Sequence, residues 1–311
     1  MQTPVGTQRI YALDALRAFL MFFGLLVHAG SHTSIVAGMN LIALVSGLFR
    51  MEGFFVLAGF FAAMILAKSD ARTFHGRRLQ GILLPFLVVL PTNLIAIALQ
   101  EVYLERRTTF FPAFAVGELQ MPWHLHLWFL LVLAGYTMLT VPLLKIVDAV
   151  RALGTSLPVP PHLATLAMAV GGVLFARLLI NAALGGDATL DDRLYPIVAF
   201  GNYVPFYLVG IVAYRSDTYR AALVNPRNWD VAIWGAVGAV SAAVRFGTEP
   251  APVAILAAEA ALSLAVFSLL CAAFQRLIRG PIPVVAFLAD AAYTVYLLHY
   301  LVMWEIGRAH V

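Results

Sequence analysis

The chain contains long apolar stretches, several of which run for about 20 residues with hardly a charged side chain. An α-helix needs about 20 apolar residues to cross the hydrocarbon core of a bilayer, whereas the strands of a membrane barrel would alternate apolar and polar residues. The composition agrees with helices in lipid, because 62% of the residues are hydrophobic and only 12% are charged. We therefore expect an all-α, polytopic membrane helical bundle.

Nine apolar stretches predict nine transmembrane helices, with a truncated tenth to follow. They cover residues 13–30, 41–66, 82–100, 125–146, 163–184, 197–214, 230–246, 251–274 and 284–305. The loops between them are short, so we expect residues 1–311 to form a single integral-membrane domain. Residues 305–311 back-translate to a common sequencing-library adaptor, which predicts that this ending is readthrough and that the natural protein continues.

Basic residues are distributed unequally between the two predicted sides. With the N-terminus in the cytoplasm, the outside loops carry three, which are Arg106, Arg107 and Arg193. The inside segments carry twelve, which are Arg9, Lys68, Arg72, Arg77, Arg78, Lys145, Arg151, Arg215, Arg220, Arg227, Arg276 and Arg279. Cytoplasmic loops of membrane proteins have such an excess of Lys and Arg. This distribution indicates a cytoplasmic N-terminus, and the net charge of +4 therefore reflects membrane topology rather than nucleic-acid binding.

The first apolar stretch carries ionisable side chains, which are costly in a bilayer and mark candidate functional positions. Arg17 and His28 are eleven residues apart, so both lie on one helix face, about 16 Å apart along the axis. An embedded imidazole can exchange protons near neutral pH. Three structural interpretations stay open: Asp14 could cap the helix or pair with Arg17, Arg17 could reach the headgroups, and His28 could be a packed core residue.

Further polar side chains fall in the outer halves of other stretches, and we expect them to share a depth with His28. They are Arg50, Glu52, His124, His126 and His299. Rotation of the helices could still place these side chains on different faces. Two structural interpretations also stay open: Arg50 could pair with Glu52, and Trp128 could belong to an interfacial aromatic belt. Too few metal ligands cluster to predict a metal site. The single cysteine, Cys271, lies in an apolar run and is expected in the core.

Four segments resemble motifs of the membrane-bound acyltransferase-3 family, in the family's order. Residues 13–19 followed by His28 resemble its R-x10-H opening, residues 54–61 are similar to its F-F-x-L-[SA]-G-F motif, and residues 126–130 and 296–299 match later signatures. The resemblance covers essentially the whole chain. The first two motifs and the basic segment 68–78 look most like the branch that contains the periplasmic-glucan succinyltransferase, glucan biosynthesis protein C.

The resemblance implies a membrane-bound O-acyltransferase of a bacterial inner membrane. It would transfer an acetyl or succinyl group from cytoplasmic acyl-CoA to a hydroxyl of a carbohydrate or cell-envelope glycan, with no bound cofactor. His28 would act as general base or as a transient acyl carrier. Arg17 would also be catalytic and would bind the donor together with Arg77 and Arg78, although membrane topology explains the last two equally well. The residues that would orient His28 or bind the acceptor are Asp14, Glu52, His126, Trp128 and His299.

A proton-coupled secondary transporter or glycan exporter is the alternative function. Intramembrane His, Arg and Glu suit proton coupling, and Pro85 and Pro91 are expected to interrupt a span. A transporter should spread its polar residues along a pathway, whereas an acyltransferase of this kind should gather them at two ends of one face. A scaffold or sensor, the remaining alternative, would support no acyl transfer that depends on His28.

Overall fold

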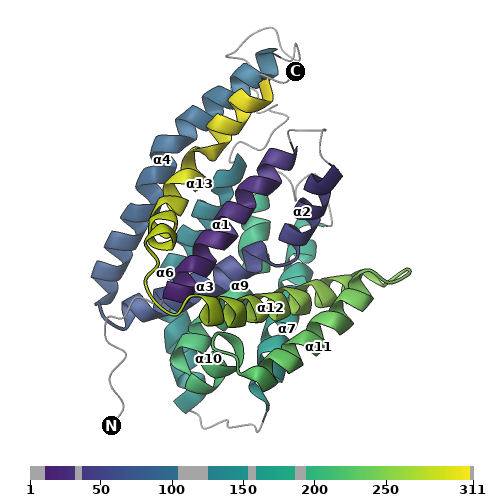
Figure 1. Ribbon diagram of the computed structural model, residues 1–311. Coiled ribbons are helices and arrows are strands. Elements are labelled where there is room, and N and C mark those ends of the chain that lie inside the picture. The colour runs from purple at the N-terminus through teal and green to yellow at the C-terminus, as the bar shows by residue number, and fades with distance from the viewer. Residues whose placement is uncertain (1–10, 32–36, 104–124, 153–158, 186–193, 309–311) are drawn as a thin grey trace.

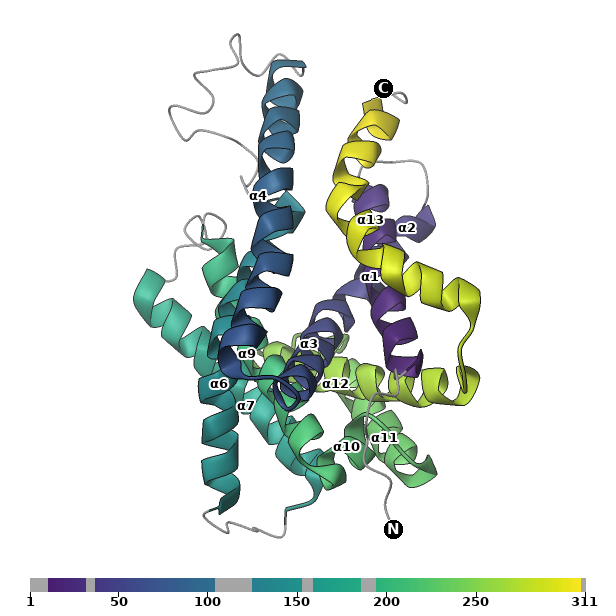
Figure 2. The same ribbon diagram turned by 90° about the vertical axis from the view of Figure 1, so that its left-hand side faces the viewer.

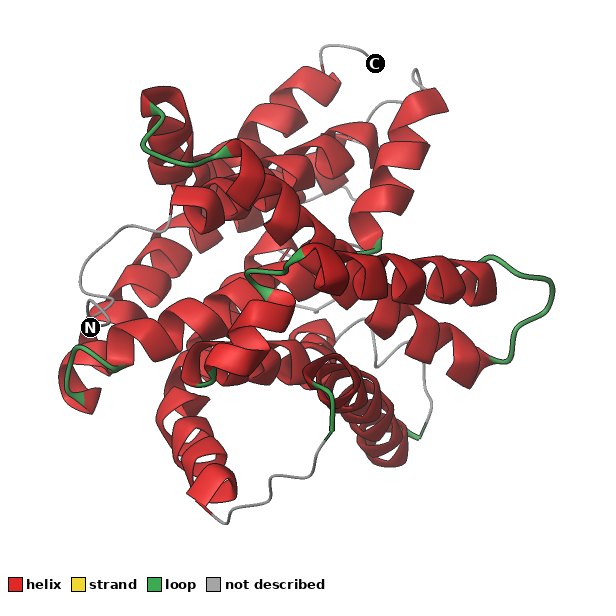
Figure 3. Cartoon of the chain, turned by 60° about the horizontal axis from the view of Figure 1, so that its bottom comes forward, coloured by secondary structure: helices red, strands yellow, loops and turns green. Residues whose placement is uncertain are grey.

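The computed structural model describes the backbone outside residues 1–10, 32–36, 104–124, 153–158, 186–193 and 309–311. The side chains at 27–31, 37–40, 96–103, 125 and 300–308 also lie outside the described residues. Every regular element in the described part is a helix (Figures 1 and 3), which confirms the all-α class. The elements are α1 (Tyr11–Ser31), α2 (Ala37–Gly47), α3 (Arg50–Leu66), α4 (Ala71–Tyr103), η1 (Leu125–Leu127), α6 (Trp128–Ala152), α7 (Pro161–Leu184), α9 (Tyr195–Arg215), α10 (Asp217–Leu223), α11 (Asn228–Arg245), α12 (Pro252–Leu277) and α13 (Pro283–Arg308).

Six segments of the described chain are long and apolar enough to cross a membrane, so the expected count of nine or ten spans is not confirmed. They are Leu41–Leu66, Ala71–Ile95, Trp128–Ala152, Pro161–Leu184, Tyr195–Arg215 and Pro252–Leu277. The other three predicted stretches fall on α1, α11 and α13. The side chains of α1 are described only as far as residue 26, α11 has Asp230 and Arg245 near its ends, and α13 contributes a shorter apolar segment, Pro283–His299.

The predicted stretch 41–66 is broken between two helices. α2 ends at Gly47 and α3 begins at Arg50. The turn between them is tied to α12, because the Ser263 hydroxyl donates a hydrogen bond to the Leu48 carbonyl oxygen at 2.7 Å. The break therefore fixes Arg50 at the first turn of α3, inside the bundle.

The centre of the bundle is the crossing of α3 and α9, which approach each other backbone to backbone. A Cβ atom at Gly59 would collide with the carbonyl oxygen of Tyr207, and one at Gly210 would collide with that of Val56. Small residues at a helix crossing permit this close approach. Gly59 and Gly210 therefore permit the close packing of α3 on α9.

Helix α4 runs through both of its internal prolines, which corrects the expectation that Pro85 and Pro91 interrupt this span. A proline leaves the carbonyl four residues earlier without its helical donor, and in membrane helices neighbouring side chains can satisfy that carbonyl. For Pro85 the carbonyl belongs to Gly81, and the Tyr293 hydroxyl of α13 donates to it at 3.0 Å. Of the features cited in favour of a transporter, the interruption of this span by prolines is therefore absent from the fold.

Helices α1, α2, α4, α6 and α12 also contact α3. Helices α11 and α12 form a hairpin at the base of the bundle (Figures 1 and 3), and α1 packs along α13. Figure 2 shows α4 on one side of α3 and the α1–α13 pair on the other. Both cavities described below lie along α3, and residues of α1, α6 and α13 also line them.

Candidate active site

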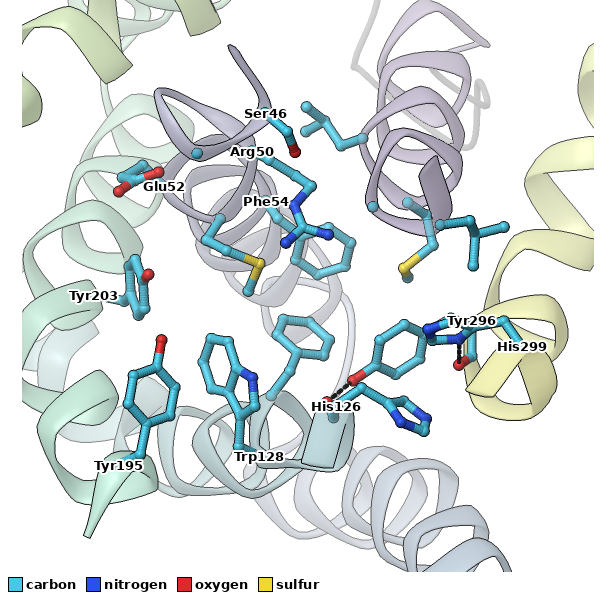
Figure 4. A pocket seen from close by; sticks show the side chains of 17 residues that line it. Ser46, Arg50, Glu52, Phe54, His126, Trp128, Tyr195, Tyr203, Tyr296 and His299 are labelled. Atoms are coloured by element: carbon cyan, nitrogen blue, oxygen red, sulfur yellow. Dashed lines mark hydrogen bonds between the residues drawn. The ribbon is translucent and has the colours of Figure 1, made fainter. Parts of the chain in front are cut away.

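The first cavity lies at the start of α3 and has a volume of about 260 Å³. We call it the Arg50 cavity. Its polar and aromatic side chains come from α2, α3, η1, α6, α9 and α13 (Figure 4), and they are Ser46, Arg50, Glu52, Phe54, His126, Trp128, Phe129, Tyr195, Tyr203, Tyr296 and His299. Four of the outer residues grouped by the sequence, Arg50, Glu52, His126 and His299, thus surround one space. His124, the fifth, lies outside the described residues.

The guanidinium of Arg50 projects into this cavity (Figure 4). It also lies against α1, because a Cβ atom added at Gly24 would collide with Nη1 of Arg50. The Arg50 Nε is buried with no hydrogen-bond partner, and no carboxylate of the described chain forms an ion pair with this guanidinium. Glu52 instead also lines a smaller neighbouring cavity that holds Asn202 and Glu259. The Arg50–Glu52 ion pair considered from the sequence is therefore not formed.

His126 and His299 meet at the opposite side of the same cavity. Their ring centroids are 4.6 Å apart. Tyr296 holds both residues in place, since its hydroxyl donates a hydrogen bond to the His126 carbonyl oxygen and its own carbonyl oxygen lies 2.5 Å from Nδ1 of His299. Two imidazoles from segments far apart in the sequence are thus fixed at one wall.

Trp128 forms another wall together with two tyrosines of α9. Its ring lies parallel to that of Tyr203, with centroids 5.9 Å apart, and edge-on to that of Tyr195, with centroids 5.1 Å apart. Trp128 therefore belongs to the cavity. The sequence reasoning missed Tyr195 and Tyr203. Their hydroxyl groups in or beside an apolar stretch were the available signal.

The second cavity, which we call the Arg17 cavity, is larger, at about 540 Å³. Its ionisable side chains are Asp14, Arg17, Arg78 and Asp290. The expected partnership of Asp14 and Arg17 is present as an ion pair of 3.8 Å. The Arg78 guanidinium lies over the Phe74 ring, with Cζ 5.8 Å from the ring centroid, and its Nε is buried without a hydrogen-bond partner. Sequence reasoning missed Asp290, whose signal was a carboxylate within an apolar stretch.

The structure separates the two adjacent arginines that the sequence proposed for donor binding. Arg78 lines the Arg17 cavity, whereas Arg77 is exposed and does not line it. Neighbouring residues on a helix point about 100° apart. Only Arg78 of the pair therefore shares a cavity with Arg17.

The two cavities adjoin through an apolar layer. Met21, Phe54 and Phe129 line both of them, and the rings of Phe54 and Phe129 meet edge to face with centroids 4.6 Å apart. Two polar clusters therefore lie on either side of a thin apolar partition.

His28, the predicted catalytic residue, belongs to the last part of α1. Its position comes four residues, about one helical turn, after Gly24, against which the Arg50 guanidinium lies. The side chain of His28 lies outside the described residues.

This helical bundle matches the profile of a family of membrane enzymes. The acyltransferase-3 profile, described as an acyltransferase domain, matches residues 10–309. The chain belongs to the acyltransferase-3 family, so the prediction that it is an enzyme of the acyltransferase class is confirmed.

Among named proteins, glucans biosynthesis protein C of Salmonella schwarzengrund (strain CVM19633) is 24% identical over 242 residues, and that of Salmonella typhi is 25% identical over the same length. Each match covers 72% of this chain and 63% of the relative. The likeness to glucan biosynthesis protein C, expected from the motifs, is thus confirmed. No solved structure matches the chain significantly.

Proposed function

We propose that this chain transfers an acetyl or succinyl group from cytoplasmic acyl-CoA to a hydroxyl of a cell-envelope glycan on the other side of a bacterial inner membrane. The observation that carries the proposal is the pair of adjoining cavities, one with two arginines and the other with histidines and aromatic rings. A donor and an acceptor that enter from opposite sides need two such compartments with a thin partition between them.

The Arg17 cavity suits the donor. With the N-terminus in the cytoplasm, Arg17 lies in the cytoplasmic part of α1, and Arg78 is the last residue of the basic segment 68–78. Guanidinium groups bind phosphate oxygens through paired, charge-assisted hydrogen bonds. The buried Nε of Arg78, which has no hydrogen-bond partner among the described residues, is a donor available for such a bond.

The Arg50 cavity suits the acceptor. Aromatic rings such as those of Trp128 and Tyr203 offer apolar faces to a sugar ring, and the tyrosine hydroxyls offer polar edges to its hydroxyl groups. A few convergent polar groups in a largely apolar cavity are typical of small-molecule sites. The relatives named for glucan biosynthesis support a glycan as the acceptor.

His28 would take the proton from the acceptor hydroxyl, or would carry the acyl group in a short-lived intermediate. Its position in α1 lies eleven residues beyond Arg17, about 16 Å along the helix axis. Gly24, about 10 Å beyond Arg17 by the same rise per residue, already lines the Arg50 cavity. The register of α1 therefore leads from the donor compartment toward the acceptor compartment, where a base is needed.

The arrangement fits a transporter less well. The polar residues that line the Arg50 cavity are separated from those of the Arg17 cavity by Met21, Phe54 and Phe129, whereas a proton pathway between the two would require a chain of polar groups. No feature of the described chain favours export over acyl transfer.

Acyl-CoA turnover in membranes that contain the protein tests the proposal. Acetyl-CoA and succinyl-CoA are supplied separately with a cell-envelope glycan fraction, and released thiol and acylated glycan are both measured. We expect turnover with at least one donor and a loss of about 10²- to 10⁴-fold in His28→Gln, the range for a general base. His75→Gln, a histidine of α4 that lines neither cavity, should retain turnover. Equal turnover in His28→Gln and wild type would refute the role of His28.

A further inference from the structure

Arg50 is a cation in the bundle interior that forms no ion pair with a carboxylate among the described residues, although Glu52 attracts it from beyond ion-pair distance. Its Nε is buried without a partner, and its guanidinium faces the cavity beside Gly24 (Figure 4). The residues around it are mostly apolar or aromatic, and the nearest carboxylate in the sequence, Glu52, makes no ion pair with it. The cavity therefore contains a guanidinium whose buried Nε has no hydrogen-bond partner among the described residues.

Such an arrangement costs stability. A charge removed from water is tolerated when it is paired, and an unpaired buried charge costs several kcal/mol. Function is the usual reason to retain a charged group at membrane depth. The Arg50 cavity is therefore complementary to a negative charge that arrives with, or is created on, the bound reactants.

We propose that Arg50 is a catalytic residue that stabilises the oxyanion formed during acyl transfer. This inference rests on the proposed function. The acceptor oxygen attacks the thioester carbonyl carbon and forms a new C–O bond, while the carbonyl π electrons move to the carbonyl oxygen. The acceptor hydroxyl proton passes to His28. The carbonyl bond then re-forms, the C–S bond breaks, and the coenzyme A thiolate leaves and takes up the proton.

The location of Arg50 indicates that its guanidinium stabilises the oxyanion rather than the phosphate charges of coenzyme A. Two other arginines, Arg17 and Arg78, lie in the donor cavity on the far side of the Phe54–Phe129 partition. Arg50 instead adjoins α1 one turn before the position of His28 and shares its cavity with the acceptor wall of Trp128. The tetrahedral oxyanion is the negative charge that acyl transfer itself creates between a thioester and a neutral hydroxyl.

The test compares Arg50→Gln with the wild type on acetyl-CoA and succinyl-CoA in the same membranes. Loss of one oxyanion donor lowers kcat by about 10²- to 10³-fold. We expect that loss with both donors alike, with the KM values for donor and acceptor changed by less than about threefold, because the oxyanion exists only in the transition state. A loss confined to succinyl-CoA would show that Arg50 binds the carboxylate of the acyl group and would overturn the inference, as would a raised KM with unchanged kcat.

A second variant moves the guanidinium without removing it. Gly24→Ala places a methyl group where Nη1 of Arg50 lies, and a small displacement of a catalytic group can cost about 10²-fold. We expect kcat to fall in Gly24→Ala. Gly171→Ala in α7, where an added Cβ meets nothing within 4 Å, is the matched control and should retain wild-type kcat. Equal activity in both glycine variants would contradict the inference.

Thermal unfolding separates a catalytic role from a structural one without relying on turnover. Because Arg50 is unpaired, Arg50→Gln should unfold at a temperature no lower than the wild type. A clearly lower Tm would show that Arg50 supports the fold, and would overturn the inference. If the wild-type protein turns over neither donor, the proposed function itself fails and the inference falls with it. A retained kcat in Arg50→Gln alongside an active wild type rejects the inference alone.

Discussion

Replacing Arg78 with glutamine removes a guanidinium from the donor cavity and keeps a side chain of similar length. Arg78 lines the cavity with Arg17, and its Nε is buried with no hydrogen-bond partner in the described part of the chain. If this group binds an anionic or carbonyl oxygen of acyl-CoA, the variant loses a hydrogen bond made by a charged donor. Such bonds contribute about 1.5 to 3 kcal/mol, and each 1.4 kcal/mol corresponds to about a tenfold change.

The expected result is therefore a kcat/KM for acyl-CoA lowered by about 10- to 150-fold. The change should appear chiefly in KM for the donor, because binding of coenzyme A is the same in the ground state and the transition state. Thiol release is measured against acyl-CoA concentration at a fixed glycan concentration. The KM for the glycan should stay unchanged, since the acceptor occupies the other cavity.

Arg77→Gln is the matched control for Arg78→Gln. It removes the same charge from the next residue, which is exposed and does not line the cavity. An equal loss in both variants would show that the general positive charge of this segment attracts the donor. Full donor affinity in Arg78→Gln would refute the assignment of the Arg17 cavity to acyl-CoA.

Three further predictions concern stability, each measured by thermal unfolding of the purified protein. Gly59→Ala should destabilise the α3–α9 crossing by about 1 to 3 kcal/mol, because the new methyl group collides with the Tyr207 carbonyl; an unchanged Tm would contradict the close crossing. Trp234→Phe should cost about 1 to 3 kcal/mol, because the Trp234 indole donates to the Ala222 carbonyl at 2.7 Å in the buried interior; a cost near zero would mean that this carbonyl has another donor. Asp70 accepts hydrogen bonds from Thr73, which lower the pKa of its carboxyl below its usual range. The Asp70 carboxylate thus stabilises the fold above the unfolded pKa of 3.8, and this stabilisation is lost as the pH falls through the lower folded pKa. The Tm difference between wild type and Asp70→Asn should therefore vanish at acid pH, and a difference that persisted there would contradict the prediction.

The fold class follows from the sequence because apolar length alone specifies membrane helices. Helix boundaries depend on tertiary contacts that the pattern does not contain. The break before Arg50 is held by Ser263, more than 200 residues away. The continuity of α4 through Pro85 depends on Tyr293 of another helix. The sequence pattern contains neither contact. Hydropathy therefore joined α2 to α3, and the two prolines suggested a break in α4 that is not there.

The candidate site was predictable to the extent that it depends on depth. Arg50, His126 and His299 were expected to share a level in the membrane, and they surround one cavity. Helix rotation was not predictable, which is why Arg77 and Arg78 looked equivalent in the sequence although only Arg78 lines a cavity. The partition between the cavities also depends on rotation, because it consists of ordinary apolar residues such as Met21 and Phe54.

Transfer across a sealed membrane is the most direct test of the two-compartment account. Purified protein is reconstituted into sealed vesicles that enclose the glycan fraction, and labelled acyl-CoA is added only outside. The account predicts labelled glycan inside the vesicles and free coenzyme A outside, with neither in vesicles that carry His28→Gln. Labelled glycan that forms only when donor and acceptor share one side would contradict it.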